Sequence, residues 1–157
     1  MPDMRGLWTH KTGFTLVELM IVVVILAILA MIAMAGYGSA SEDAKESALT
    51  ANLQIMREVL QRYRVEHHGR GPELDENGNT DLANALDRLM SKTQRSGKID
   101  ANGPLGPYLR RVPTNPYNER NDIRMDGAAP GANTAGWHYN SSTQRFSADD
   151  SAENAEL

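Results

Sequence analysis

The feature that most constrains this chain is a long apolar run near its amino terminus. Residues 19–35 are drawn only from Ala, Val, Ile, Leu and Met, and residues 14–35 contain a single charged side chain, Glu18. As an α-helix, residues 14–35 extend roughly 33 Å, which matches a hydrocarbon core of ~30 Å. The run therefore predicts a membrane-spanning helix. It leaves Glu18 to be explained, because a carboxylate at the centre of such a helix costs ~2.5–3.5 kcal/mol.

The short stub before the run indicates how the chain is oriented. Residues 1–13 contain Arg5 and Lys11 against one acidic residue, Asp3. A slightly basic stub predicts that the amino terminus stays in the cytoplasm and that the chain beyond the run crosses the membrane. A cleaved secretory signal is the alternative, because residues 33–35, A-M-A, have the form of its cleavage site. Such a signal needs only ~7–15 apolar residues, so the longer run favours an anchor.

The rest of the chain is polar and limits the kinds of partner and chemistry. Beyond Glu42 about 115 residues remain, enough for one small domain with a modest core. The formal charge of −4, without a basic patch, argues against a nucleic-acid partner. The absence of cysteine excludes a disulfide framework and thiol chemistry.

The residues at the start of the run closely resemble a known processing signal. Lys11-Thr-Gly13 is followed by Phe14-Thr-Leu-Val-Glu18 and then by the apolar run. This order is similar to the class III signal of type IV pilins and type II secretion pseudopilins. The resemblance implies that a prepilin peptidase cuts between Gly13 and Phe14 on the cytoplasmic face, and that Phe14 is then N-methylated.

The resemblance also gives Glu18 a role in filament assembly. Cleavage exposes a cationic amine on Phe14, close to the positive end of the helix dipole. A carboxylate one turn along offsets that charge, within the subunit or from a neighbour, and the pairing is stronger in apolar surroundings than at a surface. In the family this pairing is taken to register each subunit in the filament. The alternative is an interfacial glutamate that is merely tolerated at a helix end.

Helical periodicity continues beyond the apolar run. Large apolar side chains recur at steps of four and three on one face: Leu49, Leu53, Met56, Leu60 and Tyr63. Two glycines and Pro72 follow His67 and predict the end of the helix. One long helix is therefore expected over about residues 14–67.

A shorter helix and three strands are expected in the polar part of the chain. Residues 81–91 form the helix, with Thr80 or Asp81 as its cap. Its inner face is expected to carry Leu82, Leu86, Leu89 and Met90. Strands are expected at 121–126, 136–140 and 144–148, the last two as a hairpin. The predicted fold is α+β and pilin-like, with a long N-terminal helix packed on a small antiparallel β-sheet.

Within the family, the chain resembles the major pseudopilins of type II secretion in two further places. These proteins carry a Y-x-x-x-x-x-x-x-x-P helix end and, later, a Y-[IL]-x-R-[LV]-P-x-[DN]-P-[WY] segment. Here the first corresponds to Tyr63 and Pro72, and the second to residues 108–117, Y-L-R-R-V-P-T-N-P-Y.

Major pseudopilins commonly bind calcium in a C-terminal loop, so the resemblance makes calcium a candidate cofactor. The corresponding stretch, residues 127–136, contains no carboxylate. Candidate oxygen ligands around it are Asp122, Asp126, Asp149 and Asp150. Their spacing does not require an ion, so calcium is disfavoured and no metal ligand is assigned.

Other constellations are better explained as structure than as chemistry. His67 and His68 with His138 are a weak metal candidate, because adjacent helical residues point ~100° apart; a solvated helix end is favoured. Arg110 and Arg111 are interpreted as solvated charges rather than as a site for phosphate or an acidic partner. No phosphate-binding glycine loop, H-E-x-x-H motif or nucleophile triad is visible, so no enzymatic activity or catalytic residue is predicted.

These features predict a structural subunit of a type II secretion pseudopilus, a single-pass protein of the bacterial inner membrane with a periplasmic domain. The expected regions are a leader at 1–13, a transmembrane and polymerisation helix at 14–38, a periplasmic domain at 39–148 and an acidic flexible tail at 149–157. The implied partners are further copies of the chain, the prepilin peptidase, minor pseudopilins, membrane lipid, and the inner-membrane assembly platform with its ATPase. The alternatives are a type IV pilin of a surface filament, for adhesion, motility or DNA uptake, and a periplasmic binding domain on an uncleaved anchor.

Overall fold

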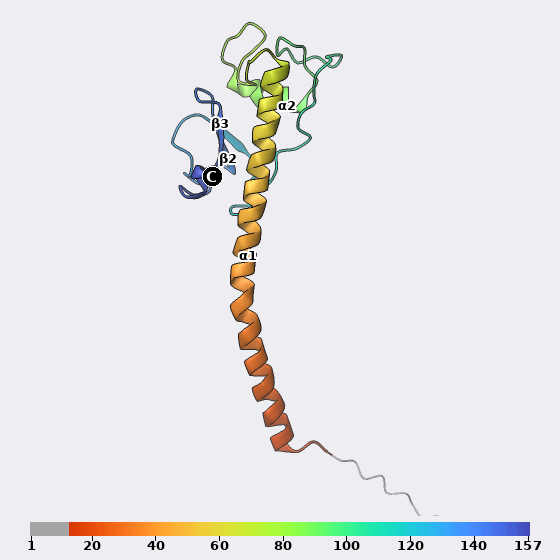
Figure 1. Cartoon of the computed structure of the whole chain (residues 1–157), viewed down its shortest axis with the longest axis vertical. Helices are drawn as coiled ribbons and strands as arrows, with labels where there is room; N and C mark the ends of the chain where they lie inside the picture. The colour runs from red at the N-terminus through yellow and green to blue at the C-terminus, as the bar shows by residue number, and fades with distance from the viewer. Residues whose placement is uncertain (1–12) are drawn as a thin grey trace, which may run out of the picture. The chain divides into compact units, whose positions relative to one another are not determined.

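The structure, a computed structural model, describes the backbone of residues 13–157 and their side chains except those of residues 35–39. Most of the expected leader, residues 1–12, lies outside the described residues. The chain divides between Glu42 and Asp43 into two compact units. Helix α1, Leu16–Glu66, passes through both (Figure 1), which confirms the long helix expected from the sequence.

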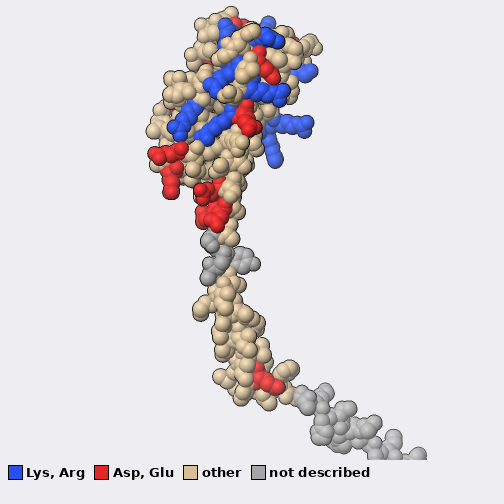
Figure 2. All heavy atoms as spheres, viewed as in Figure 1, with Lys and Arg blue, Asp and Glu red and all other residues tan. Residues whose placement is uncertain are grey.

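The part of α1 in the first unit is apolar and unburied. Its segment Leu16–Met34 is long and apolar enough to cross a membrane, and none of it is buried against the part of the chain that the structure describes. Its large apolar side chains are each at least 49% exposed, and the visible surface along most of the segment is uncharged (Figure 2). So large an apolar surface is unfavourable in water. The segment therefore needs lipid or neighbouring helices around it.

The second unit has a core built on one face of α1. The side chains of the expected stripe are all buried, none more than 5% exposed: Leu49, Leu53, Met56, Leu60 and Tyr63. They belong to one cluster with Leu89 and with three aromatic side chains of the sheet, Trp137, Tyr139 and Phe146. The rings of Trp137 and Phe146 stack with centroids 5.4 Å apart. The apolar face of α1 is thus the surface on which the sheet packs.

α1 ends where the glycines and the proline predict. His68 and Gly69 have positive φ values of 57° and 83°, the left-handed conformation that commonly terminates a helix. His67, however, is fully buried. Its ring stacks on Tyr63 at 3.7 Å, and its Nε2 lies 3.0 Å from the Thr93 hydroxyl. The expected solvated helix end is therefore wrong for His67, whereas His68 is exposed.

The expected second helix begins with a 3-10 turn, η1 Leu82–Asn84, and continues as α2 Ala85–Met90. Its N-cap residue, Asp81, makes no side-chain capping bond and pairs instead with the Arg88 guanidinium at 2.5 Å. Arg88 is 3% exposed, whereas Met90 is 38% exposed. The predicted inner face is wrong at Met90, because Arg88 turns inward to donate to two backbone carbonyls.

Three short strands form one sheet in the order β1-β2-β3: β1 Ile123–Met125, β2 Trp137–Asn140 and β3 Arg145–Ala148. β2 and β3 form the expected antiparallel hairpin, with Tyr139 opposite Phe146. β1 runs parallel to β2, so the sheet is mixed and the antiparallel expectation is wrong for this pair. A parallel pair needs a crossover connection of about a dozen residues, and the loop at 126–136 supplies it. The α+β class, a long helix with a small sheet, is confirmed.

The acidic end of the chain, expected as a flexible tail at 149–157, folds back on the second unit instead. The turn η2, Asn154–Glu156, packs against β3. Ala155 is 6% exposed and Asp149 is fully buried. The Arg57 guanidinium of α1 donates to the Leu157 carbonyl at 2.9 Å.

Candidate functional site

The predicted cleavage point lies in a short exposed stretch before α1. Gly13 and Phe14 are not helical, and Phe14 is 80% exposed. A side-chain carbon added to Gly13 would meet no neighbouring atom. The Gly13–Phe14 bond therefore lies in an exposed, non-helical stretch that a protease can reach.

Glu18 lies in the first turn of α1 and forms a reciprocal pair with Thr15. The Thr15 backbone N–H donates to the Glu18 carboxylate at 2.9 Å, and the Glu18 backbone N–H donates to the Thr15 hydroxyl at 3.2 Å. The same hydroxyl also donates to the carboxylate at 2.9 Å. This is a capping box, in which side chains satisfy two backbone donors that the helix leaves unpaired. Sequence reasoning missed Thr15, although the T-x-x-E pattern before an apolar run is its signature.

The capping box keeps the Glu18 carboxylate at the amino end of the helix. Both side-chain and backbone donors of Thr15 go to Oε2, and no hydrogen bond to Oε1 is found within the described residues. Cleavage before Phe14 would create an amine one residue from Thr15. An acceptor oxygen is therefore held near the place where that positive charge would form.

Residues 108–117, the second stretch that carries the resemblance, join the end of α1 to the sheet. The Tyr108 hydroxyl donates to the Glu66 carboxylate at 2.5 Å, which lowers the pKa of that carboxyl. Further along, the Trp137 indole donates to the Pro113 carbonyl at 2.8 Å. Between these contacts Leu109 and Val112 are buried. Arg110 and Arg111 are exposed, as the solvated interpretation predicts.

Asn115, within this segment, is fully buried and fully hydrogen-bonded. Its Nδ2 donates to the Gly136 carbonyl at 2.9 Å and to the Asp150 carboxylate at 2.7 Å. Its Oδ1 accepts the Tyr117 backbone N–H at 2.9 Å. One side chain thus joins the segment to Gly136, directly before β2, and to Asp150 near the end of the chain.

The residues proposed as calcium ligands do not form a metal site. Asp122 pairs with Arg120 at 2.7 Å, and the Asp126 carboxylate accepts two hydrogen bonds from Ser141. Asp150 accepts from two asparagine amides. Within the described part of the chain, no group of three His, Asp or Glu side chains could hold a metal ion. Each carboxylate is directed to its own protein partner, so the set does not fit calcium.

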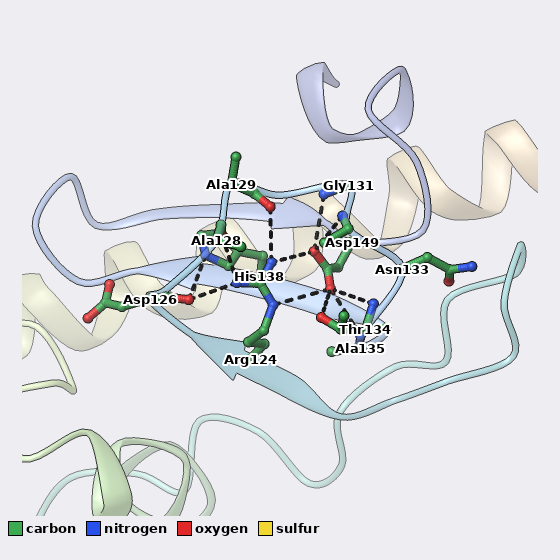
Figure 3. A network of polar contacts seen from close by, with 12 residues as sticks. Arg124, Asp126, Ala128, Ala129, Gly131, Asn133, Thr134, Ala135, His138 and Asp149 are labelled. Carbon is green, nitrogen blue, oxygen red and sulfur yellow. Dashed lines mark hydrogen bonds and ion pairs between the residues drawn. The ribbon is translucent and has the colours of Figure 1, made fainter.

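The fourth candidate, Asp149, pairs with Arg124 at 2.7 Å and is fully buried (Figure 3). Burial by itself raises the pKa of the Asp149 carboxyl. Hydrogen bonds from Arg124, Ala135 and Thr134 outweigh that effect and lower the pKa to about 2. Sequence reasoning named Asp149 but not Arg124, which lies 25 residues away in the chain.

Comparison with known proteins bears on the amino terminus. Residues 8–34 match the family described as "Prokaryotic N-terminal methylation motif". This match includes Gly13, Phe14 and Glu18 and extends to the end of the apolar segment Leu16–Met34 of α1. Neither the curated proteins nor the solved structures give a match to the chain. Residues 8–34 therefore carry a type IV pilin-like N-terminal methylation signal.

Proposed function

We propose that this chain is a structural subunit of a type II secretion pseudopilus, anchored in the bacterial inner membrane with its second unit in the periplasm. Its Gly13–Phe14 bond is cut and Phe14 is methylated. Mature subunits then assemble through their apolar helices into a filament, in contact with minor pseudopilins and with the ATPase-driven assembly platform.

The bare apolar helix supports the filament part of the proposal. None of the residues that the structure describes covers Leu16–Met34, and such a surface is stable in lipid or against other helices of the same kind. A carboxylate is costly in either setting unless it is paired. An amine at Phe14 of the same or a neighbouring subunit supplies a partner for Glu18.

The observation that carries the pseudopilus assignment is the position of residues 108–117. This stretch, which resembles a segment of major pseudopilins, contacts the end of α1 through Tyr108 and β2 through the Pro113 carbonyl, which accepts the Trp137 indole N–H. Residues 108–117 thus connect α1 to the sheet and form part of the folded structure of the second unit. The absence of cysteine agrees, because many adhesion pilins close their C-terminal region with a disulfide.

Mass spectrometry of the purified mature chain tests processing. We expect an amino terminus at N-methylated Phe14. An intact Met1 would instead indicate a binding domain on an uncleaved anchor. Cleavage after Ala35 would indicate a secretory signal.

Deletion of the gene for this chain in its host separates the pseudopilus from a surface pilus. We expect loss of secreted enzymes from the medium while twitching motility and DNA uptake persist, and restoration by a plasmid copy. Loss of motility or DNA uptake with normal secretion would establish the type IV pilin alternative.

A further inference from the structure

We propose that the Arg124 guanidinium is the resident cation of the loop at 126–136, and that this loop is held without calcium. The residues implied by the pseudopilin resemblance do not fit a metal ion, and a guanidinium lies among the oxygens of the loop instead (Figure 3). The proposal concerns only the second unit, so it does not depend on which filament the chain forms.

Every donor of Arg124 has an acceptor. Nη1 donates to the carbonyls of Asp126 and Ala128 at 2.8 and 2.7 Å. Nη2 donates to the Ala129 carbonyl at 3.1 Å and to the Asp149 carboxylate at 2.7 Å. Nε donates to the second carboxylate oxygen of Asp149 at 3.4 Å. A guanidinium has five N–H donors, and all of them are used here.

The Asp149 carboxylate is enclosed from the other side by the second half of the loop. It accepts backbone N–H groups from four residues: Gly131, Ala132, Thr134 and Ala135. It also accepts the Thr134 hydroxyl at 3.0 Å. The first half of the loop thus presents carbonyls to the cation, and the second half presents N–H groups to the anion.

The acceptor set is one that requires a positive charge. Three backbone carbonyls and a carboxylate converge on one place, which is the oxygen chemistry that calcium prefers. Arg124 supplies the charge permanently, because an arginine stays protonated in proteins. A bound ion can be removed by a chelator, whereas this cation is covalently part of β1.

The pair also connects two strands that do not touch each other. Arg124 lies on β1 and Asp149 directly follows β3, while β2 lies between these strands in the sheet. The loop that joins β1 to β2 closes around the pair. The Arg124–Asp149 pair thereby holds the parallel crossover loop against this short sheet.

Thermal unfolding of the purified full-length chain in detergent tests the proposal. The Tm of the wild-type protein is expected to be the same in excess EGTA and in millimolar calcium. A Tm that rises with calcium, or falls with the chelator, would overturn the proposal.

The Arg124→Ala variant tests the cation directly. Removing one partner of a buried pair leaves the other uncompensated, so we expect Tm to fall by on the order of 10 °C. Dilute guanidinium, at concentrations far below those that unfold proteins, should restore part of the loss, and tetramethylammonium should not. Arg120→Ala is the matched control, because Arg120 forms an exposed pair with Asp122; it should lose little and show no rescue.

If Arg124→Ala does not fold, a variant that keeps the positive charge at this position, Arg124→Lys, provides the test. Arg124→Lys has fewer donors and no planar fork, so its Tm should be lower than the Tm of the wild type and of Arg120→Ala. If Arg124→Ala folds, its Tm should be lower still. Limited proteolysis with mass spectrometry should place its new cleavages in residues 126–136. Equal Tm values for Arg124→Lys, Arg120→Ala and wild type, with no added cleavage in the loop, would contradict the proposal.

Discussion

Thr15 and Glu18 each donate a backbone N–H to the side chain of the other, at 2.9 and 3.2 Å. This capping box lies directly after the predicted cleavage point. It stabilises the first turn of α1 and keeps the carboxylate close to the amine that cleavage would release from Phe14. Two roles can thus be separated by mutation, one in capping the amino-terminal end of the helix and one in pairing with the amine.

Glu18→Ala is expected to leave cleavage at Gly13 largely intact but to reduce assembled filament by at least about tenfold, the factor that ~1.4 kcal/mol per subunit produces. The amine of Phe14 then lacks its carboxylate partner. Mass spectrometry reports cleavage, and the amount of sheared or cross-linked filament reports assembly. Normal filament yield from this variant would refute the charge pairing.

Thr15→Ala should have a smaller effect than Glu18→Ala. It removes the cap, which costs ~1 kcal/mol of helix stability, but leaves the carboxylate available to the amine. Thr15→Ser is the matched control, because serine retains the hydroxyl, and its filament yield should equal that of the wild type. An assembly defect as severe as that of Glu18→Ala would mean that the cap itself is the essential element.

Stability in acid should depend on Asp149. Its pKa is about 2 in the folded protein against an ordinary value of 3.8, so the unfolded chain binds the proton more readily. The resulting stability, of order 2 kcal/mol, is present above pH 3.8 and is lost as the pH falls toward 2. Asp149→Asn should be destabilised by ~3 kcal/mol at neutral pH and show a flatter acid limb in denaturant titrations. Asp122→Asn, at an exposed pair, should behave like the wild type.

His67 should make stability fall below neutral pH. Burial lowers the pKa of its imidazole from the ordinary 6.5, so protonation favours the unfolded chain. The contribution is fully present above pH 6.5 and decreases as the pH falls below that value. Tm measured from pH 8 to 5, a range of about three units around that pKa, should show this decrease, and His67→Gln should flatten it. His68→Gln should not, because His68 is exposed.

Asn115→Ala should destabilise the second unit by about 2–3 kcal/mol, because it removes the buried hydrogen bonds that Asn115 makes to the Gly136 carbonyl and the Asp150 carboxylate. Denaturant titration in detergent measures the loss. Asn102→Ala is the control, since Asn102 is exposed. Equal stability of the two variants would show that Asn115 does not hold residues 108–117 to the sheet.

Local patterns predicted the long helix and the amino-terminal signal. The apolar run, the stripe from Leu49 to Tyr63 and the glycines after His67 are short-range features, and α1 follows them. Gly13, Phe14 and Glu18 are close in sequence, so their proximity in space needs no tertiary contact. The capping role of Thr15 can be predicted from the sequence in the same way, because a capping box is also a local pattern.

Long-range contacts decided the rest. The sequence by itself determined where α1 and the three strands form, because periodicity and stop residues act within a few positions. Only the tertiary structure decided that β1 pairs parallel with β2, that His67 is buried on Tyr63, and that Arg124 reaches Asp149. Each of these contacts forms only when segments that are far apart in the sequence pack together. A charged or polar side chain looks the same in sequence whether solvent or a buried partner satisfies it.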